Sequence, residues 1–494
     1  MSEFTIVITI IFVFTFVPLI LAEVARNKSL PSVEDFFVYS RSMPTLLCFF
    51  TIYGTWYSTF AVVGSSAYFY FKGPVYMTTF AWNALFAVCF FILGRRIWFY
   101  GKRHNYITPT DFFSDIYKSK ALNILVTIIM LVFTLPYIQI QFSGGAYLLE
   151  IASRGQIPWE IAGIMFYTIM VVYLWAGGIR AVALTDIFFG ILVFFTMLGT
   201  GILLADKAGG VEHIFDILIQ DSVDNVTLSG KDPFNNVALW MAMFLVTPLG
   251  AIMSPPMWIR SYSVKKEKSF YLLPFLLTLA AAGYIGCFIS GNAGRVLKSG
   301  LTNSDMLIPT LLTEYGSQIL TTLLFCGFAA ASLSTANSQI HALSAIYTID
   351  IHKRWINRDV SDSRLLYIAK WAVLGVSALT YVLMIASPAI IISTGLLALS
   401  GTMQLLVPTV GALFWKKSNA TGAFAGLLGG SLTLTVLHLG FHLESSYCGV
   451  IGLAVNAVLF IILCNTTKQS SVTRDKLISY HNAFIKRNDP QKKK

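Results

Sequence analysis

Residues 53–59 read Tyr-Gly-Thr-Trp-Tyr-Ser-Thr, inside an apolar stretch that begins near Thr45. Residues 247–256 read Thr-Pro-Leu-Gly-Ala-Ile-Met-Ser-Pro-Pro, inside another apolar stretch that begins near Asn236. Glycine, proline and hydroxyl residues interrupt segments that otherwise suit continuous membrane helices. Interrupted helices at corresponding positions of two halves are typical of inverted-repeat carriers, so this pair of breaks decides the predicted fold.

The composition of the whole chain requires a lipid environment. Of its 494 residues, 56% are hydrophobic and only 12% are charged, whereas soluble proteins carry about 25% charged residues. A helical span needs about 20 apolar residues. We therefore predict an all-α integral membrane protein with about thirteen transmembrane helices, which start near Phe4, Thr45, Val75, Ala121, Trp159, Val182, Asn236, Leu272, Met306, Leu365, Pro388, Ala420 and Tyr447.

The two interrupted spans lie five helices apart, which predicts two five-helix repeats of inverted topology. The first repeat covers residues 45–205 and the second covers residues 236–414, and each begins with a broken helix. Residues 1–26 form an additional helix, residues 420–466 form two more, and residues 467–494 form a basic cytoplasmic tail. The alternative is that glycine and proline are simply more frequent in membrane helices.

The distribution of basic residues predicts the orientation. With the N-terminus outside, 29 of the 35 Lys and Arg residues fall on the cytoplasmic side, as the positive-inside rule requires. This split explains the net charge of +11 without a nucleic-acid partner. We expect a multi-pass protein of the plasma membrane with its C-terminus in the cytoplasm, where the basic tail meets anionic lipid headgroups.

Charged side chains are scarce within the predicted spans. Asp186 is expected at the cytoplasmic start of its span, and Asp, Glu, Lys and Arg are absent from the predicted midplane positions. Proton-driven carriers usually need a titratable group near the midplane. The pattern therefore argues against proton coupling, and it gives no sign of an enzyme or of a transition-metal site.

Uncharged oxygen is abundant instead. Residues 331–339 read Ala-Ser-Leu-Ser-Thr-Ala-Asn-Ser-Gln within one span. The hydroxyl groups of Ser334 and Thr335, together with carbonyl groups freed by the break at Gly54, would form a cage suited to a hard monovalent cation such as sodium. The alternative is that these hydroxyl groups bond to their own or neighbouring helices.

Polar and aromatic residues near the breaks are candidates for binding a solute. Trp56 flanks the first break. The further candidates are Ser58, Thr59, Asn83, Gln141, Ser254 and Gln404. For the amides Asn83, Gln141 and Gln404 the alternative is interhelical hydrogen bonding without a solute.

Several motifs of the chain resemble the sodium:solute symporter family, whose members carry sugars, proline, pantothenate, sialic acid and other small solutes. The resemblance extends from about residue 35 to residue 430. The similar segments are Asp35–Pro44, Thr108–Phe113, Gly177–Asp186, Pro255–Arg260 with Lys265, and Val407–Lys417 with Gly422, Ala423 and Gly426.

The resemblance implies a leucine-transporter-like core with a sodium site between the first and eighth core helices. It also implies the sodium ligands, which are the carbonyl groups of Gly54, Tyr57 and Ala331 and the hydroxyl groups of Ser334 and Thr335. The chain departs from the family pattern around the solute pocket, at Trp56, Phe189, Ser254 and Met257. These departures favour an amino acid, a vitamin or a carboxylate over a sugar.

We therefore predict sodium-coupled secondary active uptake of a small organic solute by alternating access. Two alternatives remain open. The first is a solute sensor that has this fold but does not transport, and the second is a passive channel. Neither the solute nor the sodium stoichiometry follows from the residues.

Overall fold

The computed structural model describes residues 3–152, 155–387 and 391–487. Within these ranges the regular structure is helical, and the isolated bridge between Met43 and Val264 is the single β-type pairing. Ten of the described helical segments are long and apolar enough to cross a membrane. The finer count of thirteen spans stays a prediction, and the predicted start at Pro388 lies outside the described residues.

The first half of the chain contains the first predicted break, at the end of α3 (Thr45–Trp56). The helices of this half are α1 (Glu3–Arg26), α2 (Val33–Val38), α3, α4 (Ser65–Lys72), α5 (Thr78–Cys89), α6 (Arg95–His104), α7 (Pro109–Tyr117), α8 (Lys120–Ala152), α9 (Trp159–Lys207) and α10 (Val211–Asp221). Short π-helical turns, η2 (Phe60–Gly64) and η4 (Phe90–Gly94), lead into α4 and α6.

The helices of the second half contain the second break, between α11 and α12. They are α11 (Pro233–Met253), α12 (Pro255–Ser263), α13 (Ser269–Ala280), α14 (Tyr284–Leu297), α15 (Leu307–Tyr315), α16 (Gln318–Ala345), α17 (Asp362–Ala386), α18 (Ile391–Met403), α19 (Leu406–Phe414), α20 (Ala420–Thr435), α21 (Ser445–Thr466) and α22 (Ser471–Arg487). The π-helical η8 (Ile346–Ile356) extends α16.

Helix α9 consists of two helical halves joined at Gly178, where φ is 52° and ψ is −142°. The sequence predicts two separate spans here, near Trp159 and Val182. A Cβ atom on Gly178 would lie 2.7 Å from the carbonyl oxygen of Phe36. Glycine is therefore required both by the positive φ and by the close approach of α2.

One predicted boundary is wrong. The span predicted to start near Met306 begins at Gln318 as α16, and residues 307–315 form the separate helix α15. Gly316 and Ser317 adopt extended conformations between the two helices. The apolar character of α15 concealed this interruption.

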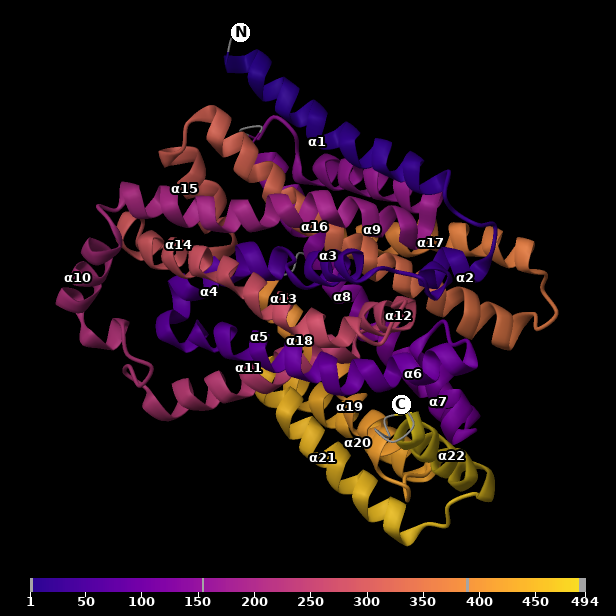
Figure 1. Cartoon of the computed structure of the whole chain (residues 1–494). Helices are drawn as coiled ribbons and strands as arrows, with labels where there is room; N and C mark the ends of the chain where they lie inside the picture. Colours follow the sequence, from indigo (N-terminus) through magenta and orange to yellow (C-terminus); the bar gives the residue numbers. More distant parts are fainter. Residues whose placement is uncertain (1–2, 153–154, 388–390, 488–494) are drawn as a thin grey trace.

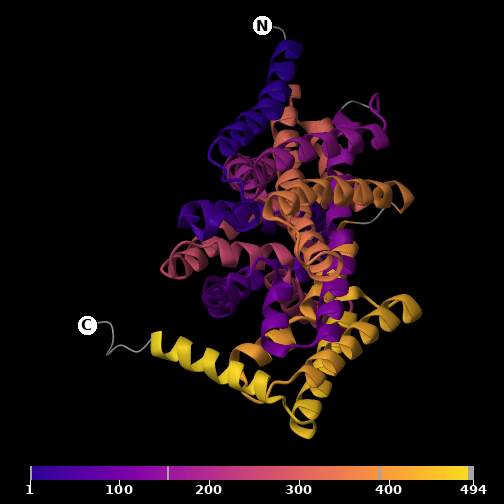
Figure 2. The ribbon, with the colours of Figure 1, turned by 90° about the vertical axis from the view of Figure 1, so that its right-hand side faces the viewer.

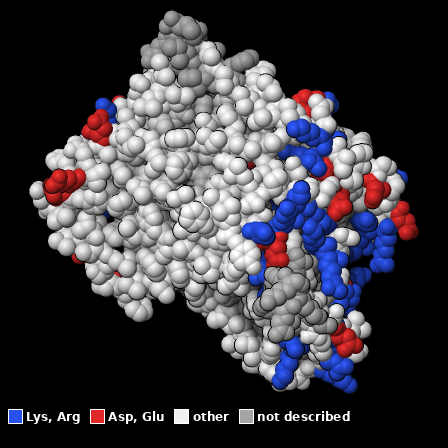
Figure 3. Space-filling view, in the orientation of Figure 1, with Lys and Arg blue, Asp and Glu red and all other residues white. Residues whose placement is uncertain are grey.

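The N-terminal and C-terminal helices lie far apart in the molecule. Helix α1 and the group α20–α22 lie at opposite edges of the molecule in both ribbon views (Figures 1 and 2). Lys and Arg gather on the right-hand side in Figure 3, where Figure 1 places α6, α7 and α22. Helix α6 contributes four of these basic residues, Arg95, Arg96, Lys102 and Arg103. We call this end of the molecule the basic face.

The segment predicted as a basic tail contains helix α22, which packs against the protein. The side chains of Thr473, Leu477, Tyr480 and Phe484 are buried along one side of it. Their spacing of three and four residues is that of a helix with one apolar face. Residues 488–494 lie outside the described residues.

Candidate functional site

The first break has a specific cause in the hydrogen bonding of α3. In a continuous helix the N–H group of Thr59 would donate to the carbonyl group of Thr55. Here it donates to Oε1 of Gln141 on α8, at 3.0 Å. Thr335 on α16 satisfies the released carbonyl groups, because its hydroxyl group lies 3.0 Å from the Gly54 oxygen and 3.3 Å from the Thr55 oxygen. Side chains of two neighbouring helices thus replace the backbone bonding at the break.

The predicted sodium residues come from two elements that meet at this break. Gly54 and Tyr57 lie at the end of α3, while Ala331, Ser334 and Thr335 lie on α16, and all five are buried. A Cβ atom on Gly54 would overlap the hydroxyl oxygen of Ser334. The structure therefore brings Gly54, Ser334 and Thr335 into contact. Their role as sodium ligands remains a prediction.

A carboxylate that the sequence did not predict at this position lies beside Ser334. The hydroxyl group of Ser334 donates to Asp186 at 2.5 Å, and that of Thr51 donates to the second oxygen of Asp186 at 2.6 Å. Asp186 is 0% exposed. The expectation that it lies at the start of its span was wrong, because the second half of α9 already begins after Gly178. Asp186 therefore lies about two turns inside that half.

A buried cation accompanies the Asp186 carboxylate. Arg260 on α12 is also 0% exposed. Its guanidinium group donates to the Thr51 hydroxyl oxygen at 3.1 Å and to the hydroxyl oxygen of Ser338. Buried charges need such compensation. Asp186 and Arg260 are therefore exceptions to the expected scarcity of buried charge. The expectation against proton coupling concerned the membrane midplane and stays a prediction.

One signal in the sequence could have revealed the pair. Asp186 and Arg260 each end a motif that we had already noted, Gly177–Asp186 and Pro255–Arg260. A carboxylate and a guanidinium group at the inner ends of two predicted spans can neutralise each other when the spans pack together. The sequence alone does not show that both side chains reach Thr51 of α3.

The second break lies at Ser254, between α11 and α12. Pro255 and Pro256 have no N–H group and cannot continue the bonding of α11. Ser254 adopts an extended conformation, and both its N–H group and its hydroxyl group donate to the carbonyl oxygen of Ala251, at 3.0 and 2.7 Å. This arrangement agrees with the predicted broken helix.

Most of the predicted solute residues lie close to the first break. The indole N–H group of Trp56 donates to Asn83 at 2.7 Å, and its ring stacks on Phe86 at 4.5 Å. The hydroxyl groups of Ser58 and Tyr137 lie 3.2 Å apart. The candidates Trp56, Ser58, Thr59, Asn83, Gln141 and Ser254 are at most 6% exposed, so this region is closed to solvent.

Gln404 does not join these residues. Its amide group donates to the carbonyl oxygens of Ser400 and Gly449, at 3.2 and 3.1 Å, and the side chain of Asn456 donates to the Gln404 carbonyl oxygen at 2.7 Å. The structure therefore places Gln404 in the contact between α18 and α21. This is the interhelical alternative that the sequence analysis left open for the amides.

Comparisons with known proteins agree with this architecture. The sodium/pantothenate symporter of Escherichia coli (strain K12) is 27% identical over 83% of this chain and 86% of its own length. The corresponding protein of Haemophilus influenzae is 27% identical over 91% of this chain and 93% of its own length. A Na+-coupled sialic acid symporter in a substrate-bound outward-open state superposes with a TM-score of 0.79 at 17% identity, covering 94% of this chain and 99% of that one.

The family model named "Sodium:solute symporter family" matches residues 36–430, which include both breaks and the buried pair Asp186 and Arg260. The resemblance drawn from the motifs is confirmed: the chain belongs to the sodium:solute symporter family.

Proposed function

We propose that this protein carries a small organic solute across the plasma membrane together with sodium, by alternating access. The observation that carries the proposal is the hydrogen bond from the Thr335 hydroxyl group to the Gly54 carbonyl oxygen, because it joins α16 to the broken helix at 3.0 Å. Sodium replaces this bond when it binds. Support also comes from membership of the sodium:solute symporter family.

The proposed sodium ligands are the carbonyl oxygens of Gly54, Tyr57 and Ala331 and the hydroxyl oxygens of Ser334 and Thr335. A set of neutral oxygens suits a hard cation. Asp186 accepts a hydrogen bond from Ser334, so its carboxylate lies next to the ion and lowers its electrostatic energy. The membrane potential adds about 2.3 kcal/mol per sodium at 100 mV.

The solute binds beside the ion, near Trp56, Ser58, Thr59, Asn83, Gln141 and Ser254. We infer an amino acid, a vitamin or a carboxylate rather than a sugar. The departures from the family pattern at Trp56, Ser254 and Met257 support this inference, as does the similarity to symporters for pantothenate and proline. Gln404 is left out of the proposed pocket because its hydrogen bonds join α18 to α21.

The proposed topology has thirteen spans with the N-terminus outside and the basic face in the cytoplasm. It counts α1, the α3–α4 unit and the two halves of α9 as separate crossings. Residues 45–205 and 236–414 are the inverted repeats. Residues 1–26 and 420–466 are additions, and residues 467–494 form the cytoplasmic end. Support comes from the gathering of Lys and Arg on one face, as the positive-inside rule requires.

Transport assays in proteoliposomes test the proposal. Uptake of a panel of amino acids, vitamins, carboxylates and sugars is measured with an inward sodium gradient and, as a control, with an equal potassium gradient. We expect one solute to accumulate with sodium only. Equal uptake under both gradients contradicts the symporter and indicates a channel. Binding of a solute without any uptake identifies the sensor.

A further inference from the structure

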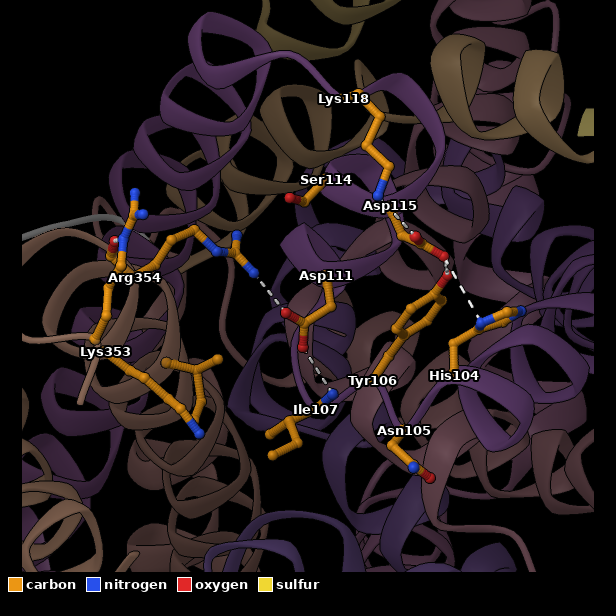
Figure 4. A pocket seen from close by; sticks show the side chains of 12 residues that line it. His104, Asn105, Tyr106, Ile107, Asp111, Ser114, Asp115, Lys118, Lys353 and Arg354 are labelled. Atoms are coloured by element: carbon orange, nitrogen blue, oxygen red, sulfur yellow. Dashed lines mark hydrogen bonds and ion pairs between the residues drawn. The ribbon is translucent and has the colours of Figure 1, made fainter. Parts of the chain in front are cut away.

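A carboxylate on the basic face joins three segments of the chain. Asp115 on α7 accepts hydrogen bonds from the hydroxyl groups of Tyr106 and Tyr480, and its carboxylate lies 2.8 Å from Nζ of Lys476 and 3.1 Å from Nζ of Lys118. Figure 4 shows Asp115 between Lys118, Tyr106 and His104. Tyr480 and Lys476 belong to α22, so this one carboxylate links α22 to α7 and to the loop after α6.

Aromatic contacts extend the attachment of α22 along α6. The ring of Tyr480 stacks on Tyr100 at 4.4 Å, and the ring of Phe484 packs edge-on against Phe99 at 5.4 Å. The guanidinium group of Arg96 lies 4.4 Å from the centre of the Phe484 ring. Cation–π and aromatic contacts of this kind add to the polar ones. Helix α22 also contacts α19, which belongs to the second predicted repeat.

Helix α6 in turn holds the inner half of the second broken helix. Gly101 packs so tightly on Tyr262 of α12 that a Cβ atom there would overlap the tyrosine ring. The indole group of Trp98 donates to the Val264 carbonyl oxygen at 2.8 Å, and Lys102 donates to the Lys265 carbonyl oxygen at 2.9 Å. A movement of α12 away from the core therefore has to move α6 as well.

Helix α7 is held from two sides across an open cleft. Asp111 pairs with Arg354 of η8 at 2.5 Å, on the side opposite to the Asp115 contacts (Figure 4). The cleft between the two sides has a volume of about 580 Å³ and is lined by both carboxylates. The opposite side of α7 packs into the protein, where Phe112, Phe113 and Ile116 are 0% exposed, so the polar contacts lie on the side of α7 that lines the cleft.

We propose that α22 is an intramolecular strap that restrains opening of the carrier at the basic face, with Asp115 as its attachment point. This inference rests on the proposed function, because only an alternating-access carrier has to open there. Opening moves α12 and α6 relative to α19, and α22 bridges these elements. Releasing α22 from Asp115 shifts the carrier toward the state that is open at the basic face.

The test measures how often this opening occurs. Cys48 on α3 is 0% exposed, and it becomes reachable when α3 and α12 separate. A variant that retains Cys48 but replaces Cys89, Cys287, Cys326, Cys448 and Cys464 by alanine is reconstituted into proteoliposomes. The rate of Cys48 labelling by N-ethylmaleimide is then followed with and without sodium. Asp115→Asn and Tyr480→Phe are introduced separately, since Tyr480→Phe keeps the stacked ring and removes one hydroxyl group.

In the parent protein we expect sodium to lower the labelling rate, because bound sodium holds α3 against α16. Asp115→Asn should raise the rate about tenfold and Tyr480→Phe about threefold, and sodium should still lower the rate in both variants. Asp475→Asn is the matched control, because Asp475 lies on the same helix with a side chain that is 71% exposed, and it should leave the rate unchanged. Unchanged labelling in both test variants overturns the strap. A rise that sodium no longer suppresses indicates general loosening and also overturns it. If sodium affects neither labelling nor uptake in the parent protein, the proposed function itself fails.

Discussion

The hydroxyl group of Thr335 on α16 donates a hydrogen bond of 3.0 Å to the carbonyl oxygen of Gly54 on α3, 281 positions earlier in the chain. The contact joins the two predicted repeats at the point where α3 stops being helical. Gly54, a proposed sodium ligand, is thus already held in place by α16, the helix that contains the proposed ligands Ala331, Ser334 and Thr335. This arrangement gives the first prediction.

Replacing Thr335 by alanine removes one proposed ligand and leaves the Gly54 and Thr55 carbonyl groups without their donor. We expect the sodium concentration for half-maximal uptake to rise at least about tenfold, because the bound ion loses one oxygen ligand, and a tenfold change corresponds to about 1.4 kcal/mol. Thr335→Ser should restore most of the affinity. Thr409→Ala is the matched control, because this buried hydroxyl group bonds to Leu405 of its own helix. If the sodium dependence of uptake is the same in Thr335→Ala and in the parent protein, Thr335 is not a sodium ligand.

Gln141 and Gln404 offer a contrast between two buried amides. Gln141→Leu removes the acceptor of the Thr59 N–H group and allows α3 to continue as a helix. Uptake should fall at least about tenfold in kcat/KM. Gln404→Leu removes the side-chain hydrogen bonds to the Ser400 and Gly449 carbonyl oxygens. It should lower the free energy of unfolding by about 1–3 kcal/mol and leave the solute KM unchanged. A large change of the solute KM in Gln404→Leu would instead indicate that Gln404 contributes to the solute pocket.

Asp186 and Arg260 should depend on each other for stability. Asp186→Asn leaves the buried guanidinium group without a counter-charge, and we expect a loss of about 3–5 kcal/mol in the free energy of unfolding. The double variant Asp186→Asn, Arg260→Met should recover part of that loss, because it removes both charges. Thermal unfolding in detergent compares the single and double variants. Additive losses would show that the two charges do not compensate each other.

Gly178 and Gly375 compare a glycine at the junction within α9 with a glycine inside the continuous helix α17. Gly178→Ala places a methyl group 2.7 Å from the Phe36 carbonyl oxygen at a φ of 52°. We expect a loss of more than about 2 kcal/mol or a failure to fold. Gly375→Ala lies within α17, where a Cβ atom meets nothing within 4 Å, and it should stabilise the protein by up to about 1 kcal/mol. Thermal unfolding and expression level measure both effects, and equal behaviour of the two variants contradicts this reading of α9.

The attachment of α22 should depend on pH through Asp115. Burial by itself raises the pKa of Asp115, but hydrogen bonds from Lys476, Tyr106, Tyr480 and Lys118 outweigh it and hold the pKa below its usual value of 3.8. Because the pKa is lowered in the folded state, the stabilisation is complete above the unfolded value and is lost as pH falls through the folded value. The charged groups that face Asp115 are Lys476 and Lys118. The His104 ring lies 3.9 Å away, and burial lowers the pKa of His104.

Hydrogen exchange of α22, corrected for intrinsic rates, checks this dependence. Protection of α22 should persist from about pH 7 to about pH 4 and fall only below that, as the carboxylate takes up a proton. In Asp115→Asn the protection should be weaker and independent of this titration. Loss of protection near pH 6 in the parent would instead assign the dependence to His104.

The hydrophobic pattern was enough to predict a helical membrane protein, and the glycine and proline clusters located both breaks. Ser334 and Thr335 stood out because hydroxyl groups are costly in lipid unless they have partners. Three features could not be predicted. The role of Gln141 depends on which helix lies beside Thr59, the Asp186–Arg260 pair depends on both side chains reaching Thr51 of α3, and the docking of α22 depends on Asp115. Each is a contact between segments far apart in sequence, for which a single chain carries no local signal.

The break in α3 has a consequence for how the protein is made. The acceptor that diverts the Thr59 N–H group belongs to α8, which is synthesised after α3. A ribosome-bound chain that ends before residue 120 lacks this acceptor. We therefore expect the backbone around Thr59 to form ordinary helical hydrogen bonds during insertion. We expect unwinding to follow the arrival of α8 and α16, so that the proposed ion site forms only late in assembly within the bilayer.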